Sequence, residues 1–120
     1  FSSFLLLRDC LQALKLDETG KIAWMSVDEK MLAGYGVNPS ELDGYINYAK
    51  NISGVEVGAF FYHTMDGETK VGFRSKTVDI SSIAFSLGGG GHPHASGCSI
   101  VGKPDEIEKM VIQKSSAMLA

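Results

Sequence analysis

Four consecutive glycines, Gly88–Gly91, run directly into His92 and Pro93, and this segment holds the residues best suited to chemistry. Successive glycines let backbone N–H groups converge into a concave nest, and they let a ligand approach the main chain without meeting a Cβ atom. An imidazole beside such a nest can donate a hydrogen bond to a phosphate oxygen. The segment therefore predicts a phosphate-binding loop, with a flexible turn as the alternative. Because no Lys-Ser or Lys-Thr pair follows the glycines, it is not a P-loop.

Arg74 is the second residue whose type and position suit a phosphate. Its guanidinium is a planar fork that matches phosphate oxygens. Gly72, two positions earlier on the same side of a predicted strand, leaves space for a ligand. Ser75 and Lys76 add a hydroxyl and a second cation close by. Taken alone, this group fits an ordinary solvated strand face equally well.

The elements that must position these residues follow from the spacing of apolar side chains and from turn and capping residues. Their order, α-β-α-α-β-β-α-β-α, is typical of an α/β fold with a small mixed sheet flanked by helices. We expect a single domain over residues 1–120, in which segment 1–17 either packs on the core or forms a helix between domains. Ser26 and Asp79 are predicted to cap two of the helices. The predicted helices cover 4–14, the segment from Ser26 to Gly34, 39–49, 78–87 and a stretch from Pro104 onward, and the predicted strands cover 22–27, 55–63, 69–76 and 97–101.

The composition is that of an ordinary globular domain, with 44% hydrophobic and 21% charged residues among 120. No apolar run approaches the length of a membrane span, so we expect no membrane partner. Two cysteines, Cys10 and Cys98, are too few for a disulfide framework and indicate reduced thiols in a cytoplasmic protein. The formal net charge of -3 argues against a protein that coats long nucleic acid. A polyanion is therefore expected to bind in a small pocket with few cations.

The combination of these features resembles one known family. The segment from Gly89 to Gly97 reads Gly-Gly-Gly-His-x-x-Ala-x-Gly, and it is similar to the GGGHxxAxG signature of the DHH-associated domain found in DHH-family phosphoesterases. The strand around Arg74 and the helix before the glycines resemble the lead-in to that signature. Within the family the sequence looks closest to the bacterial nanoRNase and pAp-phosphatase type, where pAp is 3′-phosphoadenosine 5′-phosphate. The cyclic-dinucleotide phosphodiesterase and single-strand exonuclease branches share the signature and stay open.

This resemblance implies a division of labour between two domains. An N-terminal DHH domain of the same chain, with an Asp-His-His triplet, holds two Mn²⁺ ions and cleaves, while the C-terminal domain holds a nucleotide or short oligonucleotide. The present sequence contains no Asp-His pair and starts at Phe1 rather than Met, so we expect it to be a segment of a longer metal-dependent phosphoesterase. We expect the segment itself to bind no metal or cofactor and to be inactive alone.

Carried onto this sequence, the resemblance assigns phosphate binding to a small set of residues. His92 and the glycines are expected to reach the phosphate that is cleaved, and Arg74 to hold a terminal or neighbouring phosphate. Ser96 departs from the family pattern, in which many members carry a second Ala. The expected binding residues are Arg74, Ser75, Gly89, Gly90, Gly91 and His92. The expected supporting residues are Lys76, Gly88, His94, Ala95 and Gly97.

Two other interpretations stay open. In the first, His92, His94 and Cys98, with or without His63, bind Zn²⁺, although their spacing lacks the paired ligands of a structural zinc site. In the second, the chain is a stand-alone domain that senses a nucleotide, and its leucine-rich first helix is a partner surface rather than core. We expect His63 itself to have a structural role at a strand end.

Overall fold

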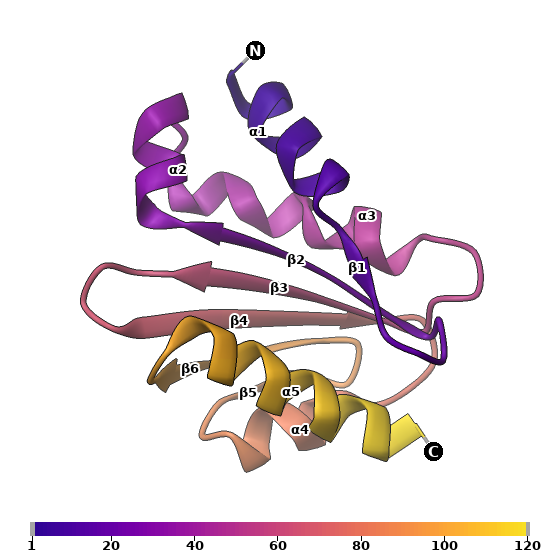
Figure 1. The fold of residues 1–120 in the computed structure, drawn as a ribbon. Coiled ribbons are helices and arrows are strands. Elements are labelled where there is room, and N and C mark those ends of the chain that lie inside the picture. The colour runs from indigo at the N-terminus through magenta and orange to yellow at the C-terminus, as the bar shows by residue number, and fades with distance from the viewer. Residues whose placement is uncertain (1, 120) are drawn as a thin grey trace.

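Residues 2–119, the part of the chain that the computed structural model describes, form six strands, five α-helices and one 3₁₀-helix (Figure 1). Residues 1 and 120, the two ends of the predicted domain, lie outside this range. Apart from the two short strands β1 and β5, the order is the predicted one, with η1 and α3 in place of one helix. In chain order the elements are α1 (Ser2–Gln12), β1 (Lys15–Leu16), β2 (Ile22–Asp28), α2 (Glu29–Tyr35), η1 (Pro39–Gly44), α3 (Ile46–Lys50), β3 (Val57–His63), β4 (Glu68–Ser75), α4 (Ser81–Ser86), β5 (Gly90–His92), β6 (Ala95–Val101) and α5 (Pro104–Leu119).

The strands form one mixed sheet in the order β1-β2-β3-β4-β6-β5, which confirms the predicted α/β class. β2 and β3 are parallel, and every other neighbouring pair within the described residues is antiparallel. A parallel pair needs a crossover connection, which α2, η1 and α3 supply. The prediction missed β1 because it has only two residues, and it missed β5 because glycine has a low strand propensity.

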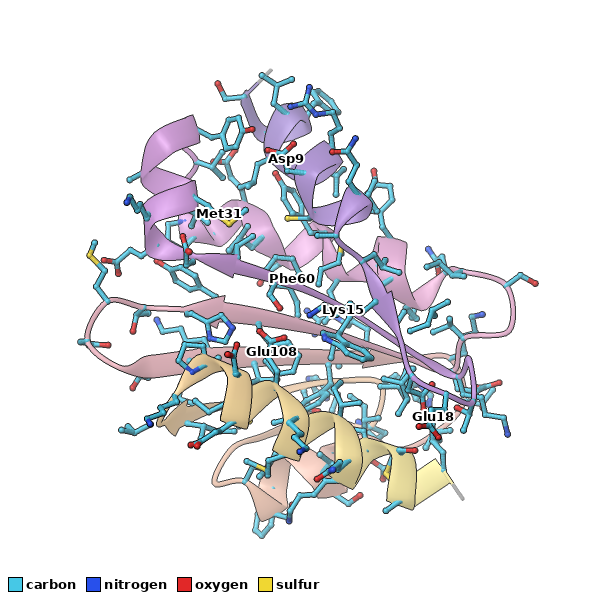
Figure 2. All side chains as sticks on the ribbon, in the orientation of Figure 1. Asp9, Lys15, Glu18, Met31, Phe60 and Glu108 are labelled. Atoms are coloured by element: carbon cyan, nitrogen blue, oxygen red, sulfur yellow. The ribbon has the colours of Figure 1, made fainter. Side chains whose placement is uncertain are left out.

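Helices cover both sides of the sheet (Figure 1). On the side of α1, α2 and α3, here called the α1–α3 face, a core forms around residues such as Leu6, Met25 and Phe60. On the side of α4 and α5, here called the α4–α5 face, Phe73 is among the fully buried residues. Figure 2 shows Phe60 on the first side of the sheet and Glu108 of α5 on the second. Since side chains alternate along a strand, each position joins one face or the other.

The helices cover only part of the α1–α3 face. Among the described residues, the core on that face includes none from β4, β5 or β6. On β4, Val71 and Phe73 point to the α4–α5 face and are buried, whereas Lys70 is exposed and Arg74 is half-buried. This is the alternation that the sequence predicts. The half of the sheet made of β4, β6 and β5 therefore keeps an open surface on the α1–α3 face.

The first helix packs on this domain. Leu6, Leu7 and Cys10 are buried in the core of the α1–α3 face. The hydroxyl of Tyr35 on α2 donates to the carboxylate of Asp9, and this hydrogen bond lowers the pKa of that carboxyl below its usual value. Helix α1 therefore contributes to the core of the α1–α3 face.

Two predicted helix starts are wrong. Ser26 lies inside β2, where its hydroxyl donates to Glu108 at 2.8 Å, and Asp28 is the N-cap of α2 instead. α4 begins at Ser81, because the carboxylate of Asp79 accepts from the N–H of Ser81 in a turn that precedes the helix. Ser26 has a partner on α5 that the local pattern does not reveal, and Asp79 closes a local turn instead of capping the helix.

A substitution at Gly58 of β3 tests how closely α3 packs on this strand. A Cβ atom added at Gly58 would lie 2.8 Å from the backbone N of Lys50, so we expect Gly58→Ala to destabilise the domain by about 1–3 kcal/mol. Gly34→Ala is the matched control, because Gly34 is helical and its added Cβ meets nothing within 4 Å. It should stabilise α2 by about 0.5–1 kcal/mol. Denaturant unfolding measures both, and equal effects would contradict the close packing.

Candidate functional site

A row of three glycines crosses three neighbouring strands on the open half of the sheet. Gly90 of β5 pairs with Gly97 of β6, and Gly97 pairs with Gly72 of β4. Residues paired across strands point to the same face. The next residue in the row, Phe60 of β3, belongs to the core of the α1–α3 face. The glycine row therefore lies on that face and presents backbone without side chains.

Charged and polar side chains flank the glycine row. His92, Ala95 and Arg74 form the adjacent row across the same three strands. Because neighbouring strands lie about 4.8 Å apart, the Cα atoms of His92 and Arg74 are roughly 10 Å apart, with the methyl group of Ala95 between them. Lys70 lies on the other side of the row, two residues from Gly72 on β4. The register thus brings Arg74 and His92 together from separate strands.

The glycine row is the floor of a hollow of about 550 Å³, here called the glycine hollow. Its walls come from η1 and from Ile46 of α3, and its volume is within the range of small-molecule sites. Lys70 and Arg74 are the cations of its lining, and Asp43 supplies a carboxylate. His92 borders it on β5 and is exposed. The lining residues are Pro39, Ser40, Leu42, Asp43, Ile46, Phe60, Tyr62, Lys70, Val71, Gly72, Arg74, Gly90, Ala95, Ser96 and Gly97.

Arg74 carries a positive charge that no carboxylate neutralises directly. Its Nη1 donates to the backbone O of Phe73 at 2.8 Å, and within residues 2–119 it forms no ion pair. Lys70 also lacks a carboxylate at ion-pair distance in the described part of the chain. Against the carboxylate of Asp43, the two cations Lys70 and Arg74 give the lining a net positive charge, which favours an anionic ligand.

The four consecutive glycines do not form the predicted nest. Gly90–His92 is extended as β5, and a two-residue turn at Pro93 and His94 joins it to β6. The glycines and the residues after Pro93 therefore pair as the two arms of a hairpin. The predicted concave loop is wrong because this pairing extends the backbone instead of curling it.

Gly89, Gly90 and Gly91 differ in the space that is available for a side chain. An added Cβ at Gly89 would lie 2.0 Å from the O of Gly97, and one at Gly91 would lie 2.7 Å from the O of Ala95. These two positions need glycine for close backbone packing. At Gly90 an added Cβ meets nothing within 4 Å. The absence of a side chain at Gly90 thus leaves space at the glycine hollow.

Ser75 is buried and faces away from the glycine hollow. Its hydroxyl donates to the backbone O of Val78, and its N–H donates to the O of His94 at 3.1 Å. The hydroxyl of Ser96, the position that departs from the family pattern, donates to the O of Ile80 at 3.2 Å. These bonds hold the turn of the hairpin against the start of α4. The structure does not bring Ser75 together with Arg74, and it gives both serines a role in positioning β5 and β6.

Three of the expected supporting residues also lie outside the hollow's lining. The Nζ of Lys76 donates to the O of Ile52 at 3.1 Å. The Nε2 of His94 lies 3.4 Å from the O of Thr77. Gly88 follows α4 with a φ of 89°, a left-handed conformation that favours glycine.

Sequence reasoning missed several residues of the glycine hollow. Lys70 is four residues from Arg74 on the same strand, so the two side chains point to the same face. The period of two in the sequence therefore could have identified Lys70 as a residue of the site. Phe60 and Asp43 come from β3 and η1, which reach the hollow only through the tertiary arrangement. No local pattern indicates their position.

His63 has the structural role that was predicted. Its Nε2 lies 2.6 Å from Oε2 of Glu108 and its Nδ1 lies 2.7 Å from Oγ1 of Thr69, so it links β3, β4 and α5. Cys98 is buried on the α4–α5 face, and burial raises the pKa of its thiol to about 11. His92 lies on the opposite face. The structure therefore does not bring the alternative zinc ligands together.

The described residues contain no group of three or more His, Cys, Asp or Glu side chains placed to hold a metal ion. They do not fit the two Mn²⁺ ions that the family resemblance implies for a DHH domain. Within residues 2–119, no helix is both long and apolar enough to cross a membrane.

Comparison with known proteins gives one family and several relatives. The model of the DHHA1 domain matches residues 20–117. The bifunctional oligoribonuclease and PAP phosphatase NrnA of Bacillus subtilis (strain 168) is 37% identical over 89 residues, which cover 74% of this chain and 28% of that protein. The probable enzyme of the same name from Streptococcus mutans is 33% identical over 86 residues, which cover 72% and 27%. The chain thus spans less than a third of the length of these relatives.

Two solved structures share the fold. An exopolyphosphatase-related protein from Bacteroides fragilis superposes with a TM-score of 0.84 at 20% identity, covering 99% of this chain and 36% of that one. The pGpG-specific phosphodiesterase PggH from Vibrio cholerae superposes with a TM-score of 0.63 at 14% identity, covering 97% and 39%. At these identities the likeness is one of fold alone.

The contrast between Gly89 and Gly90 can be tested by folding. We expect Gly89→Ala to destabilise the domain by more than about 2 kcal/mol, since its Cβ would push β5 away from β6. Gly90→Ala should change the free energy of unfolding by less than about 1 kcal/mol, because its Cβ enters open space. Urea unfolding of the two variants measures the difference. If both lose the same stability, the packing role of Gly89 is wrong.

Proposed function

The chain belongs to the DHHA1 domain family, and we propose that it holds the phosphate groups of a nucleotide or a short single-stranded oligonucleotide. The observation that carries this proposal is the glycine hollow, with its bare floor and its two cations without ion-pair partners. A floor without side chains lets a ligand approach the backbone closely. Edge strand β5 adds polar backbone groups that face no further strand.

One phosphate binds above Ala95, between Arg74 and His92. The guanidinium of Arg74 supplies a two-pronged donor, and the imidazole of His92 donates from a ring nitrogen that carries a proton. The small side chain of Ala95 is what leaves room for the anion. Lys70 lies about 13 Å further along β4, at the other side of the glycine row, where it holds a second phosphate. The site thus suits a ligand with more than one phosphate.

A short ligand fits the charge of the chain better than a long one. The formal net charge is -3, and only two cations line the glycine hollow in the described part of the chain. Proteins that coat long nucleic acid neutralise many phosphates with a basic surface. A domain with a net negative charge can instead bind a short ligand through a few contacts between its phosphates and the cations of one hollow.

The proposed parent activity is that of a metal-dependent phosphoesterase. The relatives from Bacillus subtilis and Streptococcus mutans bear the names of an oligoribonuclease and PAP phosphatase, which supports a short oligoribonucleotide or 3′-phosphoadenosine 5′-phosphate as the ligand. In this proposal a DHH domain of the same chain supplies two Mn²⁺ ions and cleaves, and the present domain holds the substrate. We place the protein in the cytoplasm, where Cys10 and Cys98 stay reduced.

Arg74 gives the direct test of phosphate binding. We expect Arg74→Ala to weaken the affinity of the chain for 3′-phosphoadenosine 5′-phosphate by about ten-fold or more, because a charge-assisted donor to the anion is lost. Arg74→Lys should recover part of the loss, since it keeps the charge without the fork. Arg8→Ala is the matched control, because Arg8 pairs with Asp9 on α1, outside the hollow's lining. Calorimetric titration measures the affinities. Equal effects of the Arg74 and Arg8 variants would contradict the proposed site.

The salt dependence of binding tests the number of phosphate contacts. Two or three contacts to a single-stranded ligand predict a slope of about -1.4 to -2 when the logarithm of the binding constant is plotted against that of the salt concentration. Titrations of a trinucleotide between low and moderate salt give this slope. A much steeper slope would indicate a long nucleic-acid interface and favour the exonuclease branch.

A further inference from the structure

A second hollow lies at the free edge of β5, on the outside of the glycine row. Ser81, Ser82 and Phe85 of α4 line it together with Gly90 and Gly91. Phe85 is 78% exposed, so its ring is accessible to a ligand in this hollow. The interior packing of α4 uses other residues, such as Ile83 and Ala84, so the fold itself does not need this ring.

The second hollow and the glycine hollow share one lining residue, Gly90. Gly90 is also the outermost residue of the glycine row and has open space where a side chain would be. A ligand that lies along the row from Gly72 therefore leaves the sheet at Gly90 without meeting a side chain. Beyond Gly90, the side chains that line the second hollow are those of Ser81, Ser82 and Phe85.

The chemistry of the second hollow differs from that of the first. Among the described residues, none with a positive charge lines it. The carboxylate of Asp79 accepts hydrogen bonds from the N–H and the hydroxyl of Ser81, a lining residue of this hollow. A phosphate is disfavoured beside this carboxylate. A neutral, flat group that offers an aromatic face and polar edges fits a phenyl ring flanked by hydroxyls and bare backbone.

We propose that Phe85 is a stacking platform for the base of the nucleotide next to the one whose phosphate binds between Arg74 and His92. This inference rests on the proposed function and adds to it a way to prefer oligonucleotides over mononucleotides. Base stacking on an aromatic side chain needs no particular base, because every base has a π face. The platform therefore selects for length rather than for sequence.

A strand of another polypeptide, added to the edge of β5, is the other occupant that an exposed edge can take. It is less well supported, because β5 has only three residues and two of them are glycines. Such a short edge offers few main-chain hydrogen bonds to an added strand. The test below distinguishes the two occupants.

The test compares two ligands on four forms of the chain by two-dimensional NMR titration. The ligands are 3′-phosphoadenosine 5′-phosphate, which has one base, and a 5′-phosphorylated adenosine trinucleotide. The forms are the wild type, Phe85→Ala, Phe85→Trp and Phe4→Ala, in which Phe4 is a similarly exposed ring on α1 at 71%. We expect Phe85→Ala to weaken trinucleotide binding by roughly five-fold to one hundred-fold, since one stacked base is lost, and to leave binding of the one-base ligand unchanged. Phe85→Trp and Phe4→Ala should bind both ligands as the wild type does.

The outcomes separate this inference from the proposed function. If Phe85→Ala leaves trinucleotide binding unchanged, or weakens both ligands equally, the stacking platform is wrong while phosphate holding stands. If the wild type binds neither ligand, phosphate holding and the platform fail together. If the amide signals of Gly90–His92 shift with protein concentration in the absence of nucleotide, strand pairing occupies this edge and the platform is again wrong.

Discussion

The antiparallel pairing of β6 with β4 on one side and with β5 on the other determines where every candidate ligand group lies. Side chains alternate along each strand, so a slip of one residue in either pairing would exchange the two faces. A slip between β5 and β6 would turn His92 to the face opposite Arg74, and the glycines would no longer form one row. The two-residue turn at Pro93 and His94 sets the β5–β6 register, and the hydrogen bonds of Ser75 and Ser96 hold that turn against α4.

The α4–α5 face of the sheet carries a closed core, whereas the α1–α3 face carries the hollow that is proposed to bind the ligand. On the α4–α5 face, α4 and α5 bury Phe61, Phe73 and Val111, and this core includes neither Lys70 nor Arg74, the cations of the glycine hollow. On the α1–α3 face, the half made of β4, β6 and β5 can stay in contact with water because its side chains, apart from Val101, are small or polar. The domain thus keeps a hollow open without exposing a large apolar patch. Changes to Arg74 or Phe85 are expected to alter binding more than folding.

The sequence allowed the fold class and the alternation of β4 to be predicted, because these follow from local periodicity and from turn residues. It did not reveal that Gly72, Gly90 and Gly97 lie in one row, since this depends on the register of three strands. Nor did it indicate that Gly89 and Gly91 serve close packing while Gly90 leaves open space. The predicted nest is absent because pairing with β6 extends the glycines as β5. The expected partnership of Ser75 with Arg74 is absent because the two residues are neighbours on one strand. Residues next to each other on a strand point to opposite faces, however close they are in sequence.

The most direct measurement is a map of backbone amide chemical-shift changes when 3′-phosphoadenosine 5′-phosphate is added to the isotopically labelled chain. If the glycine hollow holds phosphate, the largest changes fall on Gly72 and Arg74 of β4, on Ala95 and Gly97 of β6, and on Gly90 and His92 of β5. The hollow between Trp24 and Ile112 on the α4–α5 face provides an internal control, because it is of similar size and on the other side of the sheet. Largest changes around Trp24, with none along the glycine row, would contradict the account.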